Sequence, residues 1–394
     1  MRTLHVLDHS LPKISGYSIR SHAILKNLQA AGVQVFALTS DRQGPLTLPY
    51  EDIENICYFR TNSFNFLNKI KFLKQFLTIF STLISVHTAI IRLKPQVIHV
   101  HSPCTLGLAT WLIARVHGVP ILYEIRAFWE DAFNANRQQF FQWRTMLVRY
   151  LETFLCQRVD KVAVICQGLA DALEKRRISP KKICIVPNGV TIPKSTQTVD
   201  FNNETGFRNH KTIGFIGSFY AYEGILLLCQ AFLKSCATHQ TLRLLLVGTG
   251  PEFEAVKACL ATFPRQDQIH LIPAVPPDRI QEYYQRCDIL VYPRLSSPLT
   301  ETVTPLKPLE AIAQKKPILF SNVGGLLELI PNPLPDSIFA PGDVEQLTVA
   351  IEKWLNNPMH YQEWAETTYQ HIQRTRQWSE MVKRYLPEYA ALGV

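Results

Sequence analysis

Short apolar runs alternate along the whole chain with longer stretches in which apolar positions recur at helical spacing. The runs expected as strands in the first half are Leu4–Leu7, Val33–Leu38, Val97–Val100, Ile121–Ile125, Val162–Ile165 and Cys184–Val186. The stretches expected as helices there are Ser18–Ala31, Leu67–Leu93, Gly107–His117, Trp143–Arg158 and Gly168–Arg176. Strands that alternate with helices predict an α/β architecture with parallel sheets.

A polar break from Pro193 to His210 has the composition of a linker, and the same alternation begins again at Lys211. The second half has expected strands at Lys211–Gly217, Leu242–Val247, Ile269–Ile272, Ile289–Tyr292 and Pro317–Phe320. Its expected helices are Gly224–Ser235, Glu252–Ala261, Pro277–Arg286 and Pro308–Gln314, and the chain ends in the helical stretches Val344–Leu355 and Met359–Leu392. We therefore predict two Rossmann-like domains, 1–192 and 211–375, joined by a linker at 193–210, with a last helix at 376–394 that returns to the first domain. In this architecture ligands bind outside the carboxyl ends of the strands, here at a cleft between the domains.

Composition narrows the class of protein. The 394 residues are 47% hydrophobic and 19% charged, which is typical of a globular protein with sizeable cores. The nine cysteines include no Cys-x-x-Cys pair, so we expect reduced thiols and a cytoplasmic location. The net charge of +9 favours anionic partners, either a membrane surface or anionic substrates such as nucleotide sugars and sugar phosphates. No nucleic-acid-binding module is recognisable, and we expect no nucleic-acid partner.

Two apolar segments bear on membrane contact. The stretch Phe76–Ile91 is too short and too rich in Ser and Thr to span a bilayer, so we expect a buried helix. The segment Phe64–Phe76 is basic, aromatic and amphipathic. Packing onto the domain explains that pattern, and the alternative is peripheral contact with an anionic membrane, which we expect to be the inner face of the cytoplasmic membrane.

The segment Glu301–Ala311 carries the most specific chemistry. It follows a strand-like run, holds one carboxylate in an expected loop, and opens a helix at Pro308 with a second carboxylate, Glu310, in the first turn. Free N–H groups at a helix start attract phosphate, and proline there wastes no donor. A carboxylate one turn in can accept hydrogen bonds from both hydroxyls of a ribose. The segment therefore indicates a nucleotide site, and an enzyme that uses a nucleotide-activated sugar.

Several motifs occur in the order and spacing of one family. They are Ser15-Gly16-Tyr17 with Arg20, Pro187-Asn188-Gly189-Val190, Gly214-Phe215-Ile216-Gly217-Ser218, Val247-Gly248-Thr249-Gly250-Pro251, and Thr304-Pro305-Leu306 to Glu310 with Val323-Gly324-Gly325. Together they resemble the retaining glycosyltransferases of family 4, over essentially the whole chain. The resemblance implies the GT-B fold, two Rossmann-like domains facing across a cleft. It also implies transfer of a sugar from a nucleotide diphosphate donor, which we expect to be a UDP-sugar, to an acceptor hydroxyl.

Two stretches are similar to a narrower group. Tyr123–Asp131 and Gly217–Gly224 resemble the exopolysaccharide-type transferases, including those found beside bacterial exosortase systems. This implies a role in exopolysaccharide or glycoconjugate synthesis.

The chain also departs from the family pattern. The family separates its two glutamates by seven residues, but here Thr302 holds the earlier position and Glu301 lies one residue further back. The basic pair that holds the donor diphosphate in the family would fall near Ser218 and Glu223, and neither residue is basic.

The resemblance assigns roles to individual residues of the second domain. Glu310 would bind the ribose, and Glu301 would position the transferred sugar; the alternatives are a helix-favouring acid and an exposed charge. Arg294 and Lys307 would replace the missing basic pair at the diphosphate, unless they are merely solvated. The remaining donor-site candidates are Gly217, Ser218, Thr304, Pro305 and Leu306.

The first domain contributes the acceptor side and part of the donor site. Gly16 would let backbone approach the donor, and His101 would contact the acceptor or the sugar, unless it is a core histidine. Arg126 lies at or near a position where relatives carry histidine, and it would act with His101 and Glu301 in catalysis. The acceptor-side candidates are Tyr17, Arg20, Arg126 and Glu130, with Asp131 nearby; a surface cluster of salt bridges is the alternative.

No Asp-x-Asp pair occurs, and His and Cys do not cluster at zinc spacing, so we predict no metal and no cofactor other than the nucleotide sugar. The resemblance also implies that the leaving phosphate helps to deprotonate the acceptor hydroxyl, so that no enzymic nucleophile is needed. The acceptor stays open between a polyprenyl-diphosphate-linked glycan and a small sugar phosphate, as in sucrose-phosphate-type synthesis. A catalytically silent nucleotide-sugar binder is the alternative from a different class.

Overall fold

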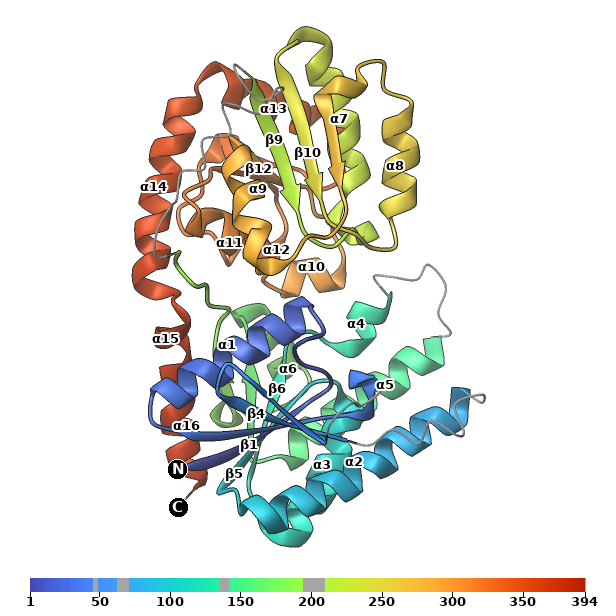
Figure 1. Cartoon of the computed structure of the whole chain (residues 1–394), viewed down its shortest axis with the longest axis vertical. Helices are drawn as coiled ribbons and strands as arrows, with labels where there is room; N and C mark the ends of the chain where they lie inside the picture. Colours follow the sequence, from blue (N-terminus) through green and yellow to red (C-terminus); the bar gives the residue numbers. More distant parts are fainter. Residues whose placement is uncertain (45–48, 62–70, 135–141, 194–209, 394) are drawn as a thin grey trace. The chain divides into compact units, whose positions relative to one another are not determined.

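The computed structural model describes residues 1–44, 49–61, 71–134, 142–193 and 210–393 (Figure 1). The chain divides into two compact units. Unit 1 comprises Met1–Asn188 with Trp378–Val394, and unit 2 comprises Gly189–Gln377. Among the described helices, none combines the length and the apolar character needed to cross a membrane.

Unit 1 is built on an eight-stranded sheet. Its strands are β1 (Arg2–Leu7), β2 (Gln34–Thr39), β3 (Tyr50–Ile53), β4 (Ile56–Arg60), β5 (Val97–His101), β6 (Ile121–Ile125), β7 (Lys161–Val164) and β8 (Ile183–Ile185). The order across the sheet is β3-β4-β2-β1-β5-β6-β7-β8, and all neighbours are parallel except β3 and β4. Its helices are α1 (Gly16–Ala30), α2 (Lys71–Leu93), α3 (Cys104–His117), α4 (Trp129–Asn134), α5 (Gln142–Arg158), α6 (Gln167–Lys175), α15 (Trp378–Met381) and α16 (Tyr385–Leu392).

Unit 2 has a smaller, wholly parallel sheet. Its strands are β9 (Lys211–Ile216), β10 (Leu242–Val247), β11 (Ile269–Ile272), β12 (Ile289–Tyr292), β13 (Ile318–Ser321) and β14 (Ile338–Phe339), in the order β11-β10-β9-β12-β13-β14. Its helices are α7 (Ile225–Thr238), α8 (Phe253–Ala261), α9 (Ile280–Arg286), α10 (Pro298–Thr302), α11 (Lys307–Ala313), α12 (Gly324–Leu327), α13 (Val344–Asn356) and α14 (Pro358–Thr375). Each of the two predicted α/β halves is therefore confirmed as a Rossmann-like unit.

The central strands are apolar along most of their length because helices cover both faces of a parallel sheet and bury the side chains on each face. Every residue of β10 and of β5 is buried, including the polar side chains that these strands carry. The helices begin and end at recognisable caps: Ser15 starts α1 with a capping box, and Gly118 in the left-handed conformation ends α3. These two local signals place the element ends within a few residues of those expected.

Some elements were not predicted. The hairpin β3–β4 turns at Glu54 and Asn55, which both have positive φ, and its first strand is rich in charge, so no apolar run marked it. The prediction that Glu301 lies in a loop was wrong. Ser297 caps a short helix, α10, with a capping box and with Pro298 in its first turn, and Glu301 belongs to that helix.

Candidate active site

The strand order of unit 2 reverses between β9 and β12, and ligands of doubly wound sheets bind at such a reversal. The turn Gly217–Ser218 follows the carboxyl end of β9, and Arg294 follows that of β12 after one proline. These two strands are neighbours near the middle of the sheet (Figure 1). The predicted donor residues on the two loops therefore meet at one edge of the sheet.

Helix α11 brings the main carboxylate to this edge. The helix starts at Lys307, one residue earlier than expected, and Glu310 lies in its first turn. The Tyr284 hydroxyl donates to Glu310 Oε2 at 3.2 Å. Burial raises the pKa of Glu310, against weaker opposing effects of the Tyr284 hydrogen bond and the Lys307 charge. Glu310 is thus a fixed carboxylate without a salt bridge in the described structure, which suits it to accept neutral hydroxyls.

The two predicted cations converge on a residue that was not predicted as a site residue. Lys307 Nζ lies 2.5 Å from Glu223 Oε1, and Arg294 Nε lies 3.7 Å from Glu223 Oε2. The side chain of Glu223 is only 4% exposed. Burial alone would raise the pKa of Glu223, but the charges of Lys307 and Arg294 hold it below its ordinary value. The three groups form a largely buried cluster with a net charge of one positive unit, and Lys307 is its most exposed member.

Gly217 explains how Lys307 reaches Glu223. A Cβ at this glycine would lie 2.2 Å from Lys307 Cε, and the glycine has φ of +147°. Only a residue without a side chain lets the lysine stem cross the loop and adopts this backbone readily. The neighbouring Ser218 is exposed. Gly217 was predicted to allow close approach of the donor. In the structure the group that lies against it is the side chain of Lys307 of the same unit.

Glu301 is exposed and faces the start of α12. Its Oε2 accepts a hydrogen bond from the Gly324 backbone N–H at 2.8 Å, and its Oε1 accepts from Ser296 Oγ at 2.6 Å. A Cβ at Gly324 would lie 2.3 Å from the Glu301 carbonyl oxygen, so glycine permits this approach. The carboxylate therefore reaches the Gly324–Gly325 turn even though it lies one residue out of register.

The connection between Glu301 and Lys307 is held by Arg294. The Arg294 Nη1 donates to the carbonyl oxygen of Val303 at 3.3 Å. Thr304 is buried there, and Pro305 and Leu306 are partly buried. These three predicted donor residues therefore form a packed segment that directly precedes α11.

The strand order of unit 1 reverses between β1 and β5. Gly16 is the first residue of α1 and is exposed, and the Tyr17 hydroxyl accepts a hydrogen bond from the Asp8 N–H at 3.0 Å. His101 is the last residue of β5. The three residues thus lie beside the reversal, as the topology requires.

Arg126 links these residues. It donates to the Tyr17 carbonyl oxygen, to His101 Nδ1 and to Glu124 Oε1, each at 2.8 Å. Its guanidinium lies 4.2 Å from the centre of the Tyr17 ring. All three nitrogens of the guanidinium are engaged inside unit 1. The structure therefore brings Arg126, His101 and Tyr17 together and gives Arg126 a means of orienting the other two.

Two predicted acceptor-side residues lie in the interior. Arg20 is 2% exposed and donates to Glu124 Oε1 at 3.2 Å and to Asn188 Oδ1 at 2.8 Å. Glu130 is 5% exposed and accepts from Arg176 Nη2 at 2.6 Å. In the described structure both side chains hold parts of unit 1 together, which favours the salt-bridge interpretation over acceptor contact.

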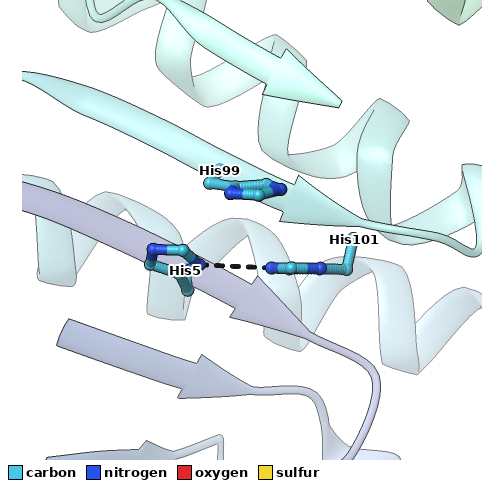
Figure 2. A group of neighbouring side chains, drawn as sticks. All are labelled: His5, His99 and His101. Atoms are coloured by element: carbon cyan, nitrogen blue, oxygen red, sulfur yellow. Dashed lines mark hydrogen bonds between the residues drawn. The ribbon is translucent and has the colours of Figure 1, made fainter. Parts of the chain in front are cut away.

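Three histidines, His5, His99 and His101, gather in the interior of unit 1 (Figure 2). The sequence did not reveal this cluster, because His5 and His101 are 96 residues apart in the chain. His5 of β1 pairs in register with His99 of β5, and His101 lies two residues on, on the same face of the sheet. His5 Nδ1 lies 3.2 Å from His101 Nε2, and His99 Nδ1 lies 2.6 Å from the Tyr389 hydroxyl. All three are fully buried.

The geometry of this histidine cluster favours a hydrogen-bond network over a metal centre. The His99 and His101 rings are stacked at 4.1 Å and 13°, so their nitrogen lone pairs lie in two nearly parallel planes and do not converge on one ion. Because Arg126 can only donate, His101 Nδ1 is an acceptor, and His101 Nε2 then donates to His5. Burial, followed by the neighbouring imidazoles, lowers the pKa of His5, and burial likewise lowers that of His101, so both rings are neutral.

Glu124 and Glu223 are the residues that sequence reasoning missed. Each is a buried carboxylate that gathers the predicted basic residues of its unit: Glu124 contacts Arg20 and Arg126, and Glu223 contacts Arg294 and Lys307. Two features of the sequence could have drawn attention to them. Glu124 is an acidic residue inside an apolar strand, and Glu223 is an acidic residue near a position that is basic in the family. Neither residue reveals its partners until the strands are paired.

Two Rossmann-like units, each built on a largely or wholly parallel sheet and the second carrying a carboxylate-bearing helix start at its strand reversal, define a glycosyltransferase of the GT-B class. Residues 14–192 match the model of Glycosyltransferase Family 4, and residues 197–371 match that of Glycosyl transferases group 1. The chain belongs to this glycosyltransferase family and is an enzyme of that type.

Similar proteins come from several kingdoms. A phosphatidylinositol N-acetylglucosaminyltransferase subunit of Saccharomyces cerevisiae is 23% identical over 81% of this chain and 68% of its own length. A sucrose-phosphate synthase from Thermosynechococcus elongatus has a similar structure, with a TM-score of 0.80 and 18% identity over 100% of this chain and 99% of that one. Anabaena HepE in complex with UDP has a TM-score of 0.74 and 13% identity over 99% of this chain and 100% of that one. At these identities the structural likeness shows the fold.

Proposed function

We propose that this enzyme transfers a sugar from a UDP-sugar to an acceptor hydroxyl with retention of the anomeric configuration, in exopolysaccharide or glycoconjugate synthesis. The observation that carries the proposal is in unit 2. The partly buried Glu310 carboxylate, the Lys307–Arg294 pair and the Gly217 turn meet where the strand order reverses. The Glu310 carboxylate matches a ribose, and the two cations, whose charge exceeds that of Glu223 by one unit, match a diphosphate.

The donor would bind with its ribose hydroxyls on Glu310 and its diphosphate near Lys307 and the Gly217–Ser218 turn. Lys307 is the more exposed of the two cations, with 18% of its side chain exposed against 5% for Arg294. Lys307 would therefore contact phosphate, while Arg294 adds its charge from behind Glu223. Glu301 and the Gly324 N–H would orient the transferred sugar.

In the reaction the bond from the anomeric carbon to the diphosphate oxygen breaks, and a bond from that carbon to the acceptor oxygen forms on the same face. The acceptor proton passes to the leaving phosphate. The charge that develops on the leaving group is stabilised by Lys307, Arg294 and the start of α11. We propose that these groups suffice without a metal ion, and turnover that needs a divalent cation after treatment with EDTA would contradict this.

For the acceptor we propose a glycan linked to a lipid diphosphate. The yeast relative bears a name that joins an N-acetylglucosaminyl group to phosphatidylinositol, which supports a lipid-borne acceptor. A small sugar phosphate is the second candidate, supported by the likeness to sucrose-phosphate synthase. Turnover of lipid-free sugar phosphates, compared with turnover of a lipid-linked glycan in detergent, separates the two.

The donor site is tested by Glu310→Gln against Glu254→Gln. Both glutamates lie in the first turn of a helix of unit 2, but Glu254 lies on α8 and is exposed. We expect Glu310→Gln to weaken UDP binding about tenfold or more, because an amide accepts fewer hydrogen bonds than a carboxylate. Glu254→Gln should bind UDP like the parent. Equal affinities for the two variants, or no thermal stabilisation of the parent by any UDP- or GDP-sugar, would rule out this donor site.

A further inference from the structure

The exposed apolar side chains of this protein gather on one layer of unit 1. Of the seventeen large hydrophobic side chains that are exposed in the described structure, nine lie on the helices α2, α3 and α5. They are Phe80, Ile84, Ile91, Leu112, Val116, Trp143, Met146, Leu147 and Tyr150. We call them the outer apolar face. Single exposed apolar residues are ordinary, but such a concentration marks an interaction site.

Helix α5 carries the densest part of this face. Trp143, Met146, Leu147 and Tyr150 are 58%, 66%, 48% and 67% exposed. Their spacing of i, i+3, i+4 and i+7 places them along one stripe of the helix. In a helix that packs only against its own sheet, such a stripe would be buried. Here the stripe points outward, away from the core of unit 1.

Helices α2 and α3 extend the face. Phe80, Ile84 and Ile91 lie on α2, and Leu112 and Val116 lie one turn apart on α3. Helix α3 packs against both α2 and α5, so the three helices form one continuous layer (Figure 1). The outer apolar face is therefore a broad surface and not a groove.

The same layer is strongly basic. Its exposed arginines are Arg92, Arg115, Arg144, Arg149 and Arg158. Among the described side chains of these three helices, the one carboxylate is Glu152, which is fully buried and accepts a hydrogen bond from the Tyr123 hydroxyl at 2.8 Å. The three helices thus offer positive charge and apolar side chains to solvent together, with no exposed acid among their own described side chains; an acid that does interact with one of these arginines, Arg149, is Asp131 of the adjoining helix α4.

We propose that the outer apolar face of α2, α3 and α5 docks on the surface of an anionic lipid bilayer. Tryptophan and tyrosine favour the boundary between acyl chains and headgroups, and arginines are attracted to anionic headgroups. Since none of the described helices can cross a membrane, the helices would lie along the interface. Nucleic acid would satisfy the arginines but not the aliphatic residues. A second copy of the chain would bring the arginines of two identical faces together.

The sequence had directed attention to Phe64–Phe76 for membrane contact. Residues 64–70 of that segment lie outside the described residues, as do the side chains of 71–76. The outer apolar face stands on other residues of the same domain. It also goes beyond the proposed sugar transfer, because a binding measurement with vesicles needs neither donor nor acceptor.

The apolar part of the face is tested with Met146→Ser and its matched control Met359→Ser. Met146 on α5 is 66% exposed, and Met359 on α14 of unit 2 is 67% exposed. The full chain is sedimented with vesicles of phosphatidylglycerol and phosphatidylcholine in equal amounts, and with vesicles of phosphatidylcholine alone. We expect binding to the anionic vesicles, weakened about threefold or more by Met146→Ser because a methionine side chain no longer enters the interface. Met359→Ser should bind like the parent.

The charged part is tested with Arg149→Glu and its control Arg374→Glu, an exposed arginine of α14 that undergoes the same change in charge. We expect Arg149→Glu to lower binding about fivefold or more, and Arg374→Glu to lower it much less. Added salt should weaken binding of the parent. Equal binding to neutral and anionic vesicles, or equal effects within each pair of variants, would overturn the proposal. A dimer in solution that Met146→Ser dissociates, without vesicle binding, would assign the face to a second copy instead.

Discussion

Glu223 shows how one residue can alter the meaning of its neighbours. Sequence reasoning placed Lys307 and Arg294 at a diphosphate because a basic pair was missing elsewhere. In the structure both cations already have a partner, and that partner is the acid that stands at one of the missing basic positions. The lysine that pairs with this glutamate comes from the start of α11, and its side chain passes the Gly217 turn to reach it. This compensation keeps one net positive charge at the strand reversal.

This arrangement predicts that substitutions of Lys307 and Glu223 affect the free energy of unfolding and the rate of sugar transfer differently. The variant Lys307→Met leaves Glu223 buried with only the more distant Arg294, and we expect it to lose about 3 kcal/mol of unfolding free energy. The double variant Glu223→Gln with Lys307→Met removes both charges and should recover much of that loss. Neither the single nor the double variant should transfer sugar, because both lack the Lys307 cation at the leaving group. Urea unfolding and turnover of UDP-sugars measure the two effects.

The control for this cycle is Glu223→Gln alone, which leaves two cations without their carboxylate. It should be less stable than the double variant. If the double variant regains turnover along with stability, Lys307 has only a structural role.

At the scale of elements, strand pairing decides what a side chain contacts. The apolar pattern predicted β1 and β5, and it identified His101 at the edge of β5, but it assigned no role to His5 or His99. The parallel register of β1 and β5 places the histidines on one face of the sheet, next to Tyr389 of α16. No local signal carries this information, since His5 and His101 are 96 residues apart in the chain.

The buried histidines predict that the protein loses stability in mild acid. Burial lowers the pKa values of His5, His99 and His101 below the ordinary 6.5, so the unfolded chain binds protons that the folded chain does not. Stability is therefore full above about pH 6.5 and falls as the pH drops below it, by up to about 1.4 kcal/mol per pH unit for each histidine. Denaturant unfolding between about pH 7.5 and about pH 5.5 measures this slope.

The variant His5→Leu should reduce that slope, although it also lowers stability at every pH because His101 loses an acceptor. The exposed His371 of α14 serves as the control, and His371→Asn should keep the slope of the parent. An unchanged slope in His5→Leu would show that His5 does not resist protonation in the folded state.

At the scale of the whole molecule, the two units differ in how the chain builds them. Unit 2 is one continuous stretch, and its two ends are joined where the Val190 N–H donates to the Arg376 carbonyl oxygen at 2.8 Å. Unit 1 needs the last residues of the chain as well. Tyr385 and Tyr389 of α16 are buried in it and hydrogen-bond to Glu124 and His99.

The segment 189–377 alone is therefore expected to fold and to bind UDP with an affinity within about threefold of that of the full chain, because the proposed donor residues of unit 2 have their partners inside it. It should not transfer sugar. Circular dichroism and titration calorimetry on the isolated segment test this. A folded segment that fails to bind UDP would mean that unit 1 supplies donor contacts, for which Gly16 is the candidate.

The sequence by itself determined the class of fold, the family and the positions of most strands and helices, because apolar periodicity and helix caps are local properties. It also located Glu310 at a helix start, since that signal lies within a few residues. Only the tertiary structure decided that Glu223 partners Lys307 and Arg294, that Glu124 gathers Arg20 and Arg126, and that α10 contains Glu301. It alone showed the outer apolar face, because the sequence pattern of an exposed stripe equals that of a buried one. Burial and electrostatic partnership depend on which strands and helices become neighbours, and residues far apart in the chain settle that together.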